Sequence, residues 1–132
     1  MSDNVSRGLS MNVADLNGVA LDYWVAIADG WGPLWHVCAI EGGQPREGVA
    51  VAHPDRAAIV CYSPSTDWCL GGPIIEKRGI TLRFRGMDQR GRWSARTVNA
   101  ERNGIVEVFG PVPLVAAMRC FVVSRLGEEV HE

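Results

Sequence analysis

The segment from residue 111 to residue 126 reads PVPLVAAMRCFVVSRL and constrains the fold more than any other part of the chain. Its two prolines suit the first turn of a helix, and Gly127 suits the residue after the last turn. At helical spacing its apolar side chains share one wide face, made of Leu114, Val115, Met118, Phe121, Val122 and Leu126. We therefore predict a helix over 113–126 that is heavily buried.

The remaining pattern predicts one more long helix and several strands. Residues 16–29 place apolar side chains at helical spacing, and residues 80–85, ITLRFR, alternate between apolar and polar side chains as a half-buried strand does. Further strands are predicted at 34–40, 57–62 (a central strand), 92–97 and 105–110, with a short helix that begins at Pro73 and ends near Gly79. The expected fold class is α+β, in which two main helices pack on a small antiparallel sheet.

Length and composition predict a single domain without a membrane span. The 132 residues, 47% of them hydrophobic, match the usual size of one domain, and we expect residues 1–10 to be a flexible lead before a domain at 11–132. No apolar run reaches the roughly 18 residues of a transmembrane helix, and the N-terminus lacks the pattern of a signal peptide. We therefore expect a cytoplasmic protein.

The cysteines and histidines indicate neither a metal site nor a catalytic one. The four cysteines form no CxxC pair and no Cys/His cluster of zinc type, so we expect free thiols, with Cys61 and Cys120 buried and Cys69 exposed. The three histidines (His36, His53 and His131) stand at no spacing typical of a catalytic triad, and no paired-carboxylate motif occurs. An enzyme is therefore the minority interpretation, with no catalytic residue, metal or cofactor assigned.

The stretch at 62–80, YSPSTDWCLGGPIIEKRGI, is the first candidate ligand site. One interpretation is local: hydroxyls and a carboxylate that form turns or caps, with Trp68 as a lid on the core. The other is a loop that offers these groups to a ribose or phosphate, with Trp68 stacked on a base and the amides of 71–73 facing an anion at a helix start. The candidate residues are Tyr62, Ser63, Ser65, Thr66, Asp67, Trp68, Gly71 and Gly72.

A basic segment at 76–102 is the second candidate. It holds eight basic residues against three acidic ones, in a chain whose net charge is −2. If the strands on either side of residues 86–91 pair, the guanidinium groups of Arg83, Arg85, Arg92 and Arg96 can converge on one face, where arginine suits phosphate recognition. The alternative is a solvated face with no ligand.

Three blocks of sequence resemble a known family. They are LNGVALDYWVAIADG at 16–30, YSPSTDWCLGGPIIEKRGI at 62–80 and FGPVPLVAAMRCFVVSRLGEEV at 109–130. In order and in amino-acid sequence, the three blocks resemble the NinX-like proteins of tailed phages and prophages. The resemblance implies a phage-encoded accessory protein in the cytoplasm of the bacterial host, and it brings no established activity to carry over.

These observations lead to a hypothesis of binding without turnover. We expect a small cytoplasmic binding protein that holds a small anionic molecule, such as a nucleotide or a nucleotide-derived host signal. Two alternatives stay open: a module that binds a host or phage protein, and a small nucleotide-processing enzyme. Nucleic-acid binding is disfavoured by the net charge and by the lack of a basic recognition helix, and a homo-oligomer stays open.

Overall fold

The computed structural model describes residues 10–31, 34–41, 44–52, 59–99 and 104–131. In chain order its elements are β1 (Ser10–Asn12), η2 (Val13–Asp15), α1 (Gly18–Ala28), β2 (Leu34–Glu41), β3 (Gln44–Ala52), β4 (Ile59–Cys61), α2 (Trp68–Arg78), β5 (Thr81–Phe84), β6 (Trp93–Asn99), β7 (Gly104–Gly110), α3 (Pro113–Leu126) and β8 (Glu129–His131). The α+β class is confirmed. Ser10, expected in the N-terminal lead, is the first residue of β1; the rest of that lead lies outside the described residues.

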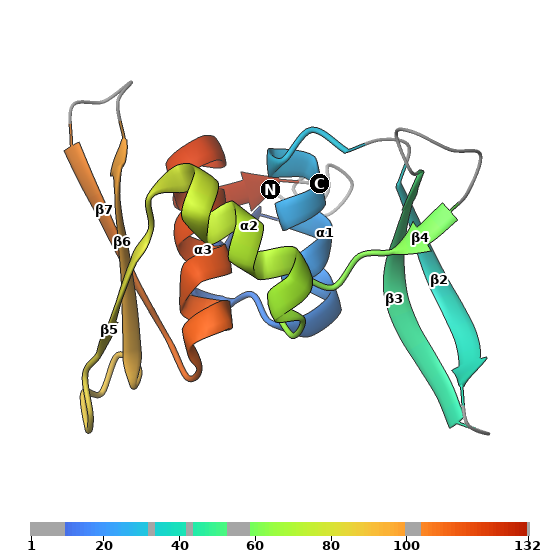
Figure 1. Cartoon of the computed structure of the whole chain (residues 1–132), viewed down its shortest axis with the longest axis horizontal. Coiled ribbons are helices and arrows are strands. Elements are labelled where there is room, and N and C mark those ends of the chain that lie inside the picture. The colour runs from blue at the N-terminus through green and yellow to red at the C-terminus, as the bar shows by residue number, and fades with distance from the viewer. Residues whose placement is uncertain (1–9, 32–33, 42–43, 53–58, 100–103, 132) are drawn as a thin grey trace, which may run out of the picture.

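The strands form three antiparallel sheets. β1 pairs with β8, and two three-stranded sheets have the orders β2-β3-β4 and β5-β6-β7. Figure 1 shows the three α-helices between the two larger sheets, so the molecule is layered as sheet, helices and sheet. The helix α3 packs against β6 and β7 and also contacts α1 and α2, whereas α1 contacts β3 on its other side.

The helix α3 occupies the centre of the core, as its wide apolar stripe predicts. All nine residues from Leu114 to Val122 are buried. Because α1, α2 and the β5-β6-β7 sheet cover it from different sides, no polar face remains along its middle. Cys120 lies in this segment as a free thiol, and burial raises its pKa to about 12.

The prediction for β4 and Cys61 is wrong. β4 is an edge strand, because β3 lies in the centre of its sheet, and Cys61 is exposed rather than buried. A short apolar run can serve as an edge strand when the neighbouring strand is longer, and here β3 spans nine residues against three in β4. Cys69 is exposed, as expected, while the side chain of Cys38 lies outside the described residues.

The start of α2 also differs from the prediction. The helix begins at Trp68, so Pro73 lies inside it rather than in its first turn. Proline has no N–H and leaves the carbonyl of Cys69 without its helical donor, a loss that water compensates where the helix surface is exposed. Pro73 and Cys69 are both exposed, which explains how the helix continues through this position.

Candidate functional site

The sequence-predicted residues at 62–68 have structural roles. The carbonyl of Ser63 accepts hydrogen bonds from the N–H groups of Thr66 and Asp67, and the buried Ser65 donates its own N–H to Asp22 Oδ1 at 2.8 Å. Tyr62 is also buried, and its hydroxyl lies 3.4 Å from Asp29 Oδ2, which also accepts from Trp31 Nε1 at 3.1 Å. These contacts define a tight turn that leads the chain from β4 into α2.

Asp67 is the N-cap of α2. Its backbone is extended, and its Oδ1 accepts the N–H of Cys69 at 2.9 Å, while its carbonyl accepts the N–H of Gly71 at 2.9 Å. The capping interpretation of this residue is therefore correct at the level of geometry. Trp68, the first helical residue, is 53% exposed and is not a lid on the core.

Gly71 serves helix packing. A Cβ at this position would lie 2.6 Å from the carbonyl oxygen of Pro64 and 2.6 Å from Leu114 Cδ2, so the close approach of α2 to α3 requires glycine. Since its N–H bonds inside the helix, Gly71 offers no amide to a ligand, and Pro73 has none to offer. The amides of 71–73 therefore do not form the anion-binding helix start that we predicted.

We expect Asp67→Ala to lower the free energy of unfolding by about 0.5–2 kcal/mol, because the first turn of α2 loses its capping acceptor. Asp67→Ser is the matched control, since a serine hydroxyl can accept the same hydrogen bond and should restore most of the loss. Urea unfolding followed by tryptophan fluorescence measures both. Equal stability of Asp67→Ala and the wild type would contradict the capping role.

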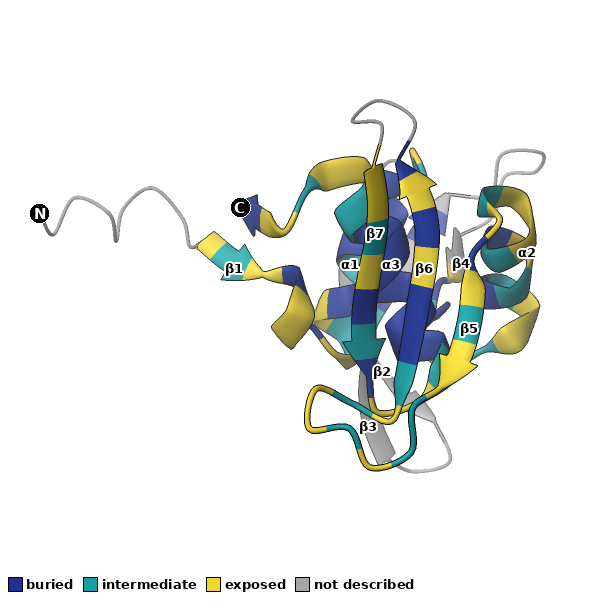
Figure 2. Ribbon diagram, turned by 90° about the vertical axis from the view of Figure 1, so that its left-hand side faces the viewer, coloured by how far each residue is buried: buried dark blue, intermediate teal, exposed yellow. Residues whose placement is uncertain are grey.

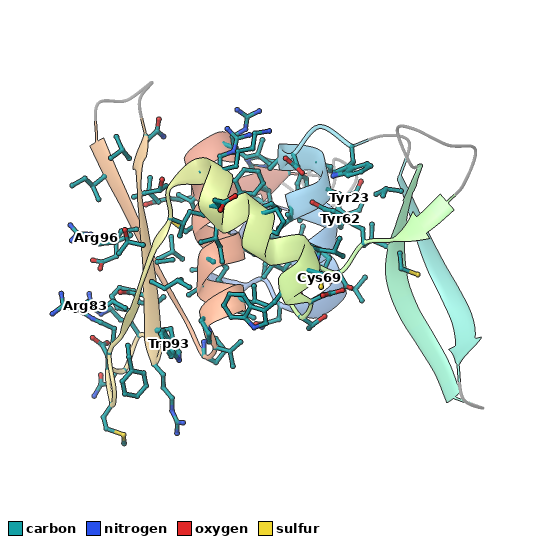
Figure 3. All side chains as sticks on the ribbon, viewed as in Figure 1. Tyr23, Tyr62, Cys69, Arg83, Trp93 and Arg96 are labelled. Carbon is teal, nitrogen blue, oxygen red and sulfur yellow. The ribbon has the colours of Figure 1, made fainter. Side chains whose placement is uncertain are left out.

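The arginines gather on the outer face of the β5-β6-β7 sheet. β5 and β6 pair across residues 85–92 in the register Thr81↔Arg96 and Arg83↔Ser94, as the sequence predicts. Alternation places Ala95, Thr97 and Asn99 toward the helices, so Arg96 faces away from them, as does Arg83, which pairs with Ser94 on the same face. Figure 3 shows Arg83 and Arg96 on the side of the sheet opposite the helices, and Figure 2 shows no element in front of this face.

The same face holds Arg85, Arg92 and Phe109. Arg85 and Arg92 are opposite each other just beyond the paired strands, where the N–H of Arg85 donates to the carbonyl of Arg92. Phe109 pairs with Ser94 in the β6–β7 register, and the guanidinium carbons of Arg85 and Arg90 lie 5.6 and 4.1 Å from the centre of its ring. The four predicted arginines therefore share one face, and a ring that the sequence did not single out lies among them.

The charges on this face are only partly balanced. Arg90 forms a two-point contact with Asp88, at 3.1 Å from Nε to Oδ1 and 2.9 Å from Nη2 to Oδ2, which holds the pKa of Asp88 at about 2. Arg96 is 4.0 Å from Glu107, a long contact between partly exposed groups. Within the described part of the chain, Arg83, Arg85 and Arg92 form no ion pair with a carboxylate, although the charge of Arg85 also contributes to the low pKa of Asp88.

Ser94 lies beneath these side chains. It is fully buried although its side chain points to the outer face, and its hydroxyl has no hydrogen-bond partner among the described residues. A buried hydroxyl without a partner is uncommon in folded proteins. Its hydroxyl therefore lies at the centre of the arginine face with its hydrogen-bonding capacity unused by the described residues.

The structure separates the two halves of the predicted site. The residues at 62–72 belong to a turn and to α2, whereas Arg83 and Arg96 lie on the far side of the β5-β6-β7 sheet (Figure 3). The prediction that Asp67 and Trp68 share one pocket with an arginine is therefore wrong. Alternation sets the face of a strand locally, but the position of α2 relative to that face depends on tertiary packing.

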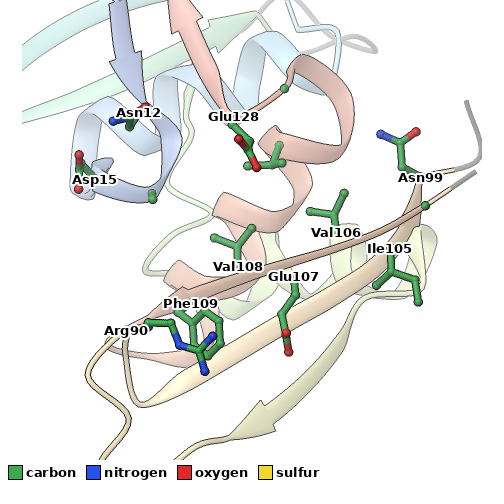
Figure 4. Close-up of a pocket in the computed structure, with 14 residues that line it drawn as sticks. Asn12, Asp15, Arg90, Asn99, Ile105, Val106, Glu107, Val108, Phe109 and Glu128 are labelled. Carbon is green, nitrogen blue, oxygen red and sulfur yellow. The ribbon is translucent and has the colours of Figure 1, made fainter. Parts of the chain in front are cut away.

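A cavity that was not predicted lies along the free edge of β7. It measures about 1,060 Å³ and is bounded by β7, η2 and the turn before β8, with Asp15, Glu107 and Glu128 among its lining residues (Figure 4). No group of three or more histidine, cysteine or acidic side chains able to hold a metal occurs among the described residues. Nor does any described helix have the length and apolar character needed to cross a bilayer. His53 and the side chain of His36 lie outside the described residues.

Comparison with known proteins identifies the family. A family described as "Bacteriophage P22, NinX" matches residues 12–125, which include α1, α2, the whole β5-β6-β7 sheet and all of α3 except Leu126. No curated protein sequence matches the chain significantly. Since the family match extends over most of the chain, this protein belongs to the NinX family of phage proteins.

Proposed function

We propose that this protein acts in the cytoplasm of the phage's bacterial host by binding a small anionic ligand, such as a nucleotide or a nucleotide-derived host signal, without turning it over. The binding surface is the arginine face: Arg83, Arg85, Arg92, Arg96 and Phe109 on the outer side of the β5-β6-β7 sheet. The observation that carries the proposal is the set of three guanidinium groups on this face, at Arg83, Arg85 and Arg92, that form no ion pair with a described carboxylate.

An anion with several charged oxygens suits such a surface. Guanidinium groups donate paired hydrogen bonds to phosphate, and a hydrogen bond to a charged group contributes about 1.5–3 kcal/mol. Phe109, fixed between Arg85 and Arg90, restrains the two side chains that stack on its ring, which lowers the entropy lost on binding. The buried Ser94 hydroxyl beneath can donate to a phosphate oxygen if the side chains above it move apart.

A second candidate is a protein partner on the same face. Val98 and Ile105 are cross-strand neighbours in the β6–β7 register, and they are 71% and 64% exposed. An exposed apolar pair beside unpaired arginines is typical of the centre of a protein interface. This alternative differs from the first because it depends on Val98 and Ile105 as much as on the arginines.

A thermal-shift assay with a panel of nucleoside mono-, di- and triphosphates and cyclic dinucleotides tests the proposal. A ligand at about one hundred times its dissociation constant stabilises the folded state by about 2.7 kcal/mol, which shifts the melting temperature by several degrees. The double variant Arg83→Gln/Arg92→Gln should lose this shift. Glu76→Gln, which changes the charge of an exposed side chain near the end of α2 and away from the arginine face, is the control and should keep it.

Two results would contradict the proposal. One is a wild-type melting temperature that no member of the panel changes. The other is a ligand-induced shift of the same size in Arg83→Gln/Arg92→Gln as in the wild type. The protein-partner alternative is favoured if Val98→Ser/Ile105→Ser abolishes capture of a specific host or phage protein while the nucleotide panel has no effect.

A further inference from the structure

A small cavity at the opposite end of α2 from Asp67 is lined by three cations. It measures about 270 Å³ and lies where the C-terminal ends of α2, α3 and β6 meet (Figure 1). Its charged lining residues are Lys77, Arg78 and Arg125, and its neutral polar ones are Thr97, Asn99 and Ser124. No acidic side chain lines it, and none of the described carboxylates forms an ion pair with any of the three cations.

Two of the cations are held in place by contacts that leave most of their donors unused. The guanidinium carbon of Arg78 lies 5.2 Å from the centre of the Phe121 ring, and no hydrogen bond from the Arg78 side chain to a described residue is found. Arg125 donates Nε to the carbonyl of Ala28 at 3.2 Å, which leaves both of its terminal nitrogens for another acceptor. Such fixed donors bind an anion at a lower entropic cost than mobile ones.

The neutral polar residues of the cavity hydrogen-bond backbone carbonyls at the helix ends. The C-terminal ends of helices expose carbonyl oxygens and carry partial negative charge. Here Thr97 Oγ1 donates to the carbonyl of Arg78 at 2.9 Å, Ser124 Oγ to that of Phe121 at 2.7 Å, and Asn99 Nδ2 to that of Ser124 at 3.3 Å. These donors occupy three carbonyls near the cavity, and the only charged side chains of the described residues that line it are the three cations.

We propose that this cavity binds the phosphate group of a small molecule. Its volume is below the roughly 300–1,000 Å³ of sites that enclose a whole drug-sized ligand, so it accommodates a phosphate with little else attached. Two planar guanidinium groups and one ammonium match the geometry of a phosphate oxyanion. The site shares no arginine with the face described above, and it stands or fails independently of the proposed function.

Backbone NMR of the full chain, titrated with inorganic phosphate and separately with a nucleoside 5′-monophosphate, tests this site. We expect saturable shifts at amides 77–79, 97–99 and 124–126. Lys77→Gln and Arg125→Gln should each weaken binding about tenfold or more, since a hydrogen bond to a charged group is lost and tenfold corresponds to about 1.4 kcal/mol. Arg83→Gln, a matched loss of charge on the arginine face, should leave the affinity read from the shifts at these amides as it is in the wild type.

The two titrations distinguish the sources of the phosphate. Equal affinities mean that the phosphate group alone is recognised, and tighter binding of the monophosphate means that its ester substituent adds contacts at the rim; either result supports the site. The proposal is overturned if neither titration gives saturable shifts at these amides. It is also overturned if Lys77→Gln and Arg125→Gln bind as the wild type does, or if Arg83→Gln weakens binding as much as they do.

Discussion

Arg119→Ala should lower the free energy of unfolding by about 3–4 kcal/mol, the largest loss that we expect from any polar substitution in this chain. Arg119 is only 7% exposed and lies in the buried middle of α3. Its Nε donates to the carbonyl of Leu16 at 2.9 Å, Nη1 to the carbonyl of Phe109 at 2.9 Å, and Nη2 to Asn17 Oδ1 at 2.8 Å.

These three bonds join α3 to two other parts of the molecule. Leu16 and Asn17 directly precede α1, and Phe109 belongs to β7, so one guanidinium group fixes the start of a helix and the edge of a sheet. Without it, two carbonyls lose their donor in a region with little access to water, and each unsatisfied group costs about 1–3 kcal/mol. Burial lowers the pKa of Arg119, and the charge of Asp15 opposes that shift.

Arg125→Ala is the matched control for Arg119→Ala. It removes the same side chain from the same helix, but Arg125 is exposed and makes one hydrogen bond, so its loss should cost no more than about 1 kcal/mol. Urea unfolding measures both variants. If Arg119→Ala and Arg125→Ala lower the free energy of unfolding equally, the three hydrogen bonds of Arg119 contribute no more stability than the single one of Arg125. Arg119→Lys should lose an intermediate amount, because an ammonium cannot reach all three acceptors.

Arg119 also shows where sequence reasoning reaches its limit. Helical and strand periodicity predicts α3, α1 and the β5–β6 hairpin, because these patterns reflect which side of a single element is buried. It equally places Arg83, Arg85, Arg92 and Arg96 on one face. A single arginine in an apolar helix gives no such signal, since its three acceptors lie at residues 16, 17 and 109 and meet only in the folded chain.

The sequence cannot decide between a structural and a ligand-binding role for the stretch at 62–80, for a related reason. Hydroxyls, a carboxylate and glycines in a short segment fit a turn, a cap and a ligand loop equally well, and proline is common both at a helix start and, on an exposed side, further in. The contacts in the folded chain decide which role each residue has. Ser65 donates to Asp22, Asp67 accepts the N–H of Cys69, and Gly71 lies against Leu114. Two of these three partners lie more than forty positions away in the sequence.

Asp22 holds the turn at 63–66 from the adjacent helix α1. It is 5% exposed, and its carboxylate accepts the buried N–H of Ser65 at 2.8 Å. Burial raises the pKa of Asp22 above its ordinary value of 3.8, an effect that the hydrogen bond from the N–H of Ser65 only partly offsets. Because the folded-state pKa is the higher one, the unfolded chain loses this proton first. The stability that Asp22 contributes is therefore greatest below pH 3.8 and declines as the pH rises through the folded-state value.

The two substitutions of Asp22 should consequently have opposite results at neutral pH. Asp22→Ala leaves the buried N–H of Ser65 without an acceptor and should lower the free energy of unfolding by about 2–3 kcal/mol. Asp22→Asn keeps an acceptor oxygen and carries no charge, and its N–H groups can donate to the Ser65 hydroxyl, which has no partner among the described residues. It should therefore be at least as stable as the wild type.

The difference in unfolding free energy between Asp22→Asn and the wild type, measured as a function of pH, separates the effect of the Asp22 charge from that of its hydrogen bond. Urea unfolding at a series of pH values should show the advantage of Asp22→Asn growing as the pH rises from acid to neutral, because only the wild type ionises at this position. Other titrating groups are common to both chains and cancel in the difference. An advantage that shrinks toward neutral pH would mean that the folded state stabilises the charged carboxylate, in which case the hydrogen bond from Ser65 outweighs the burial of Asp22.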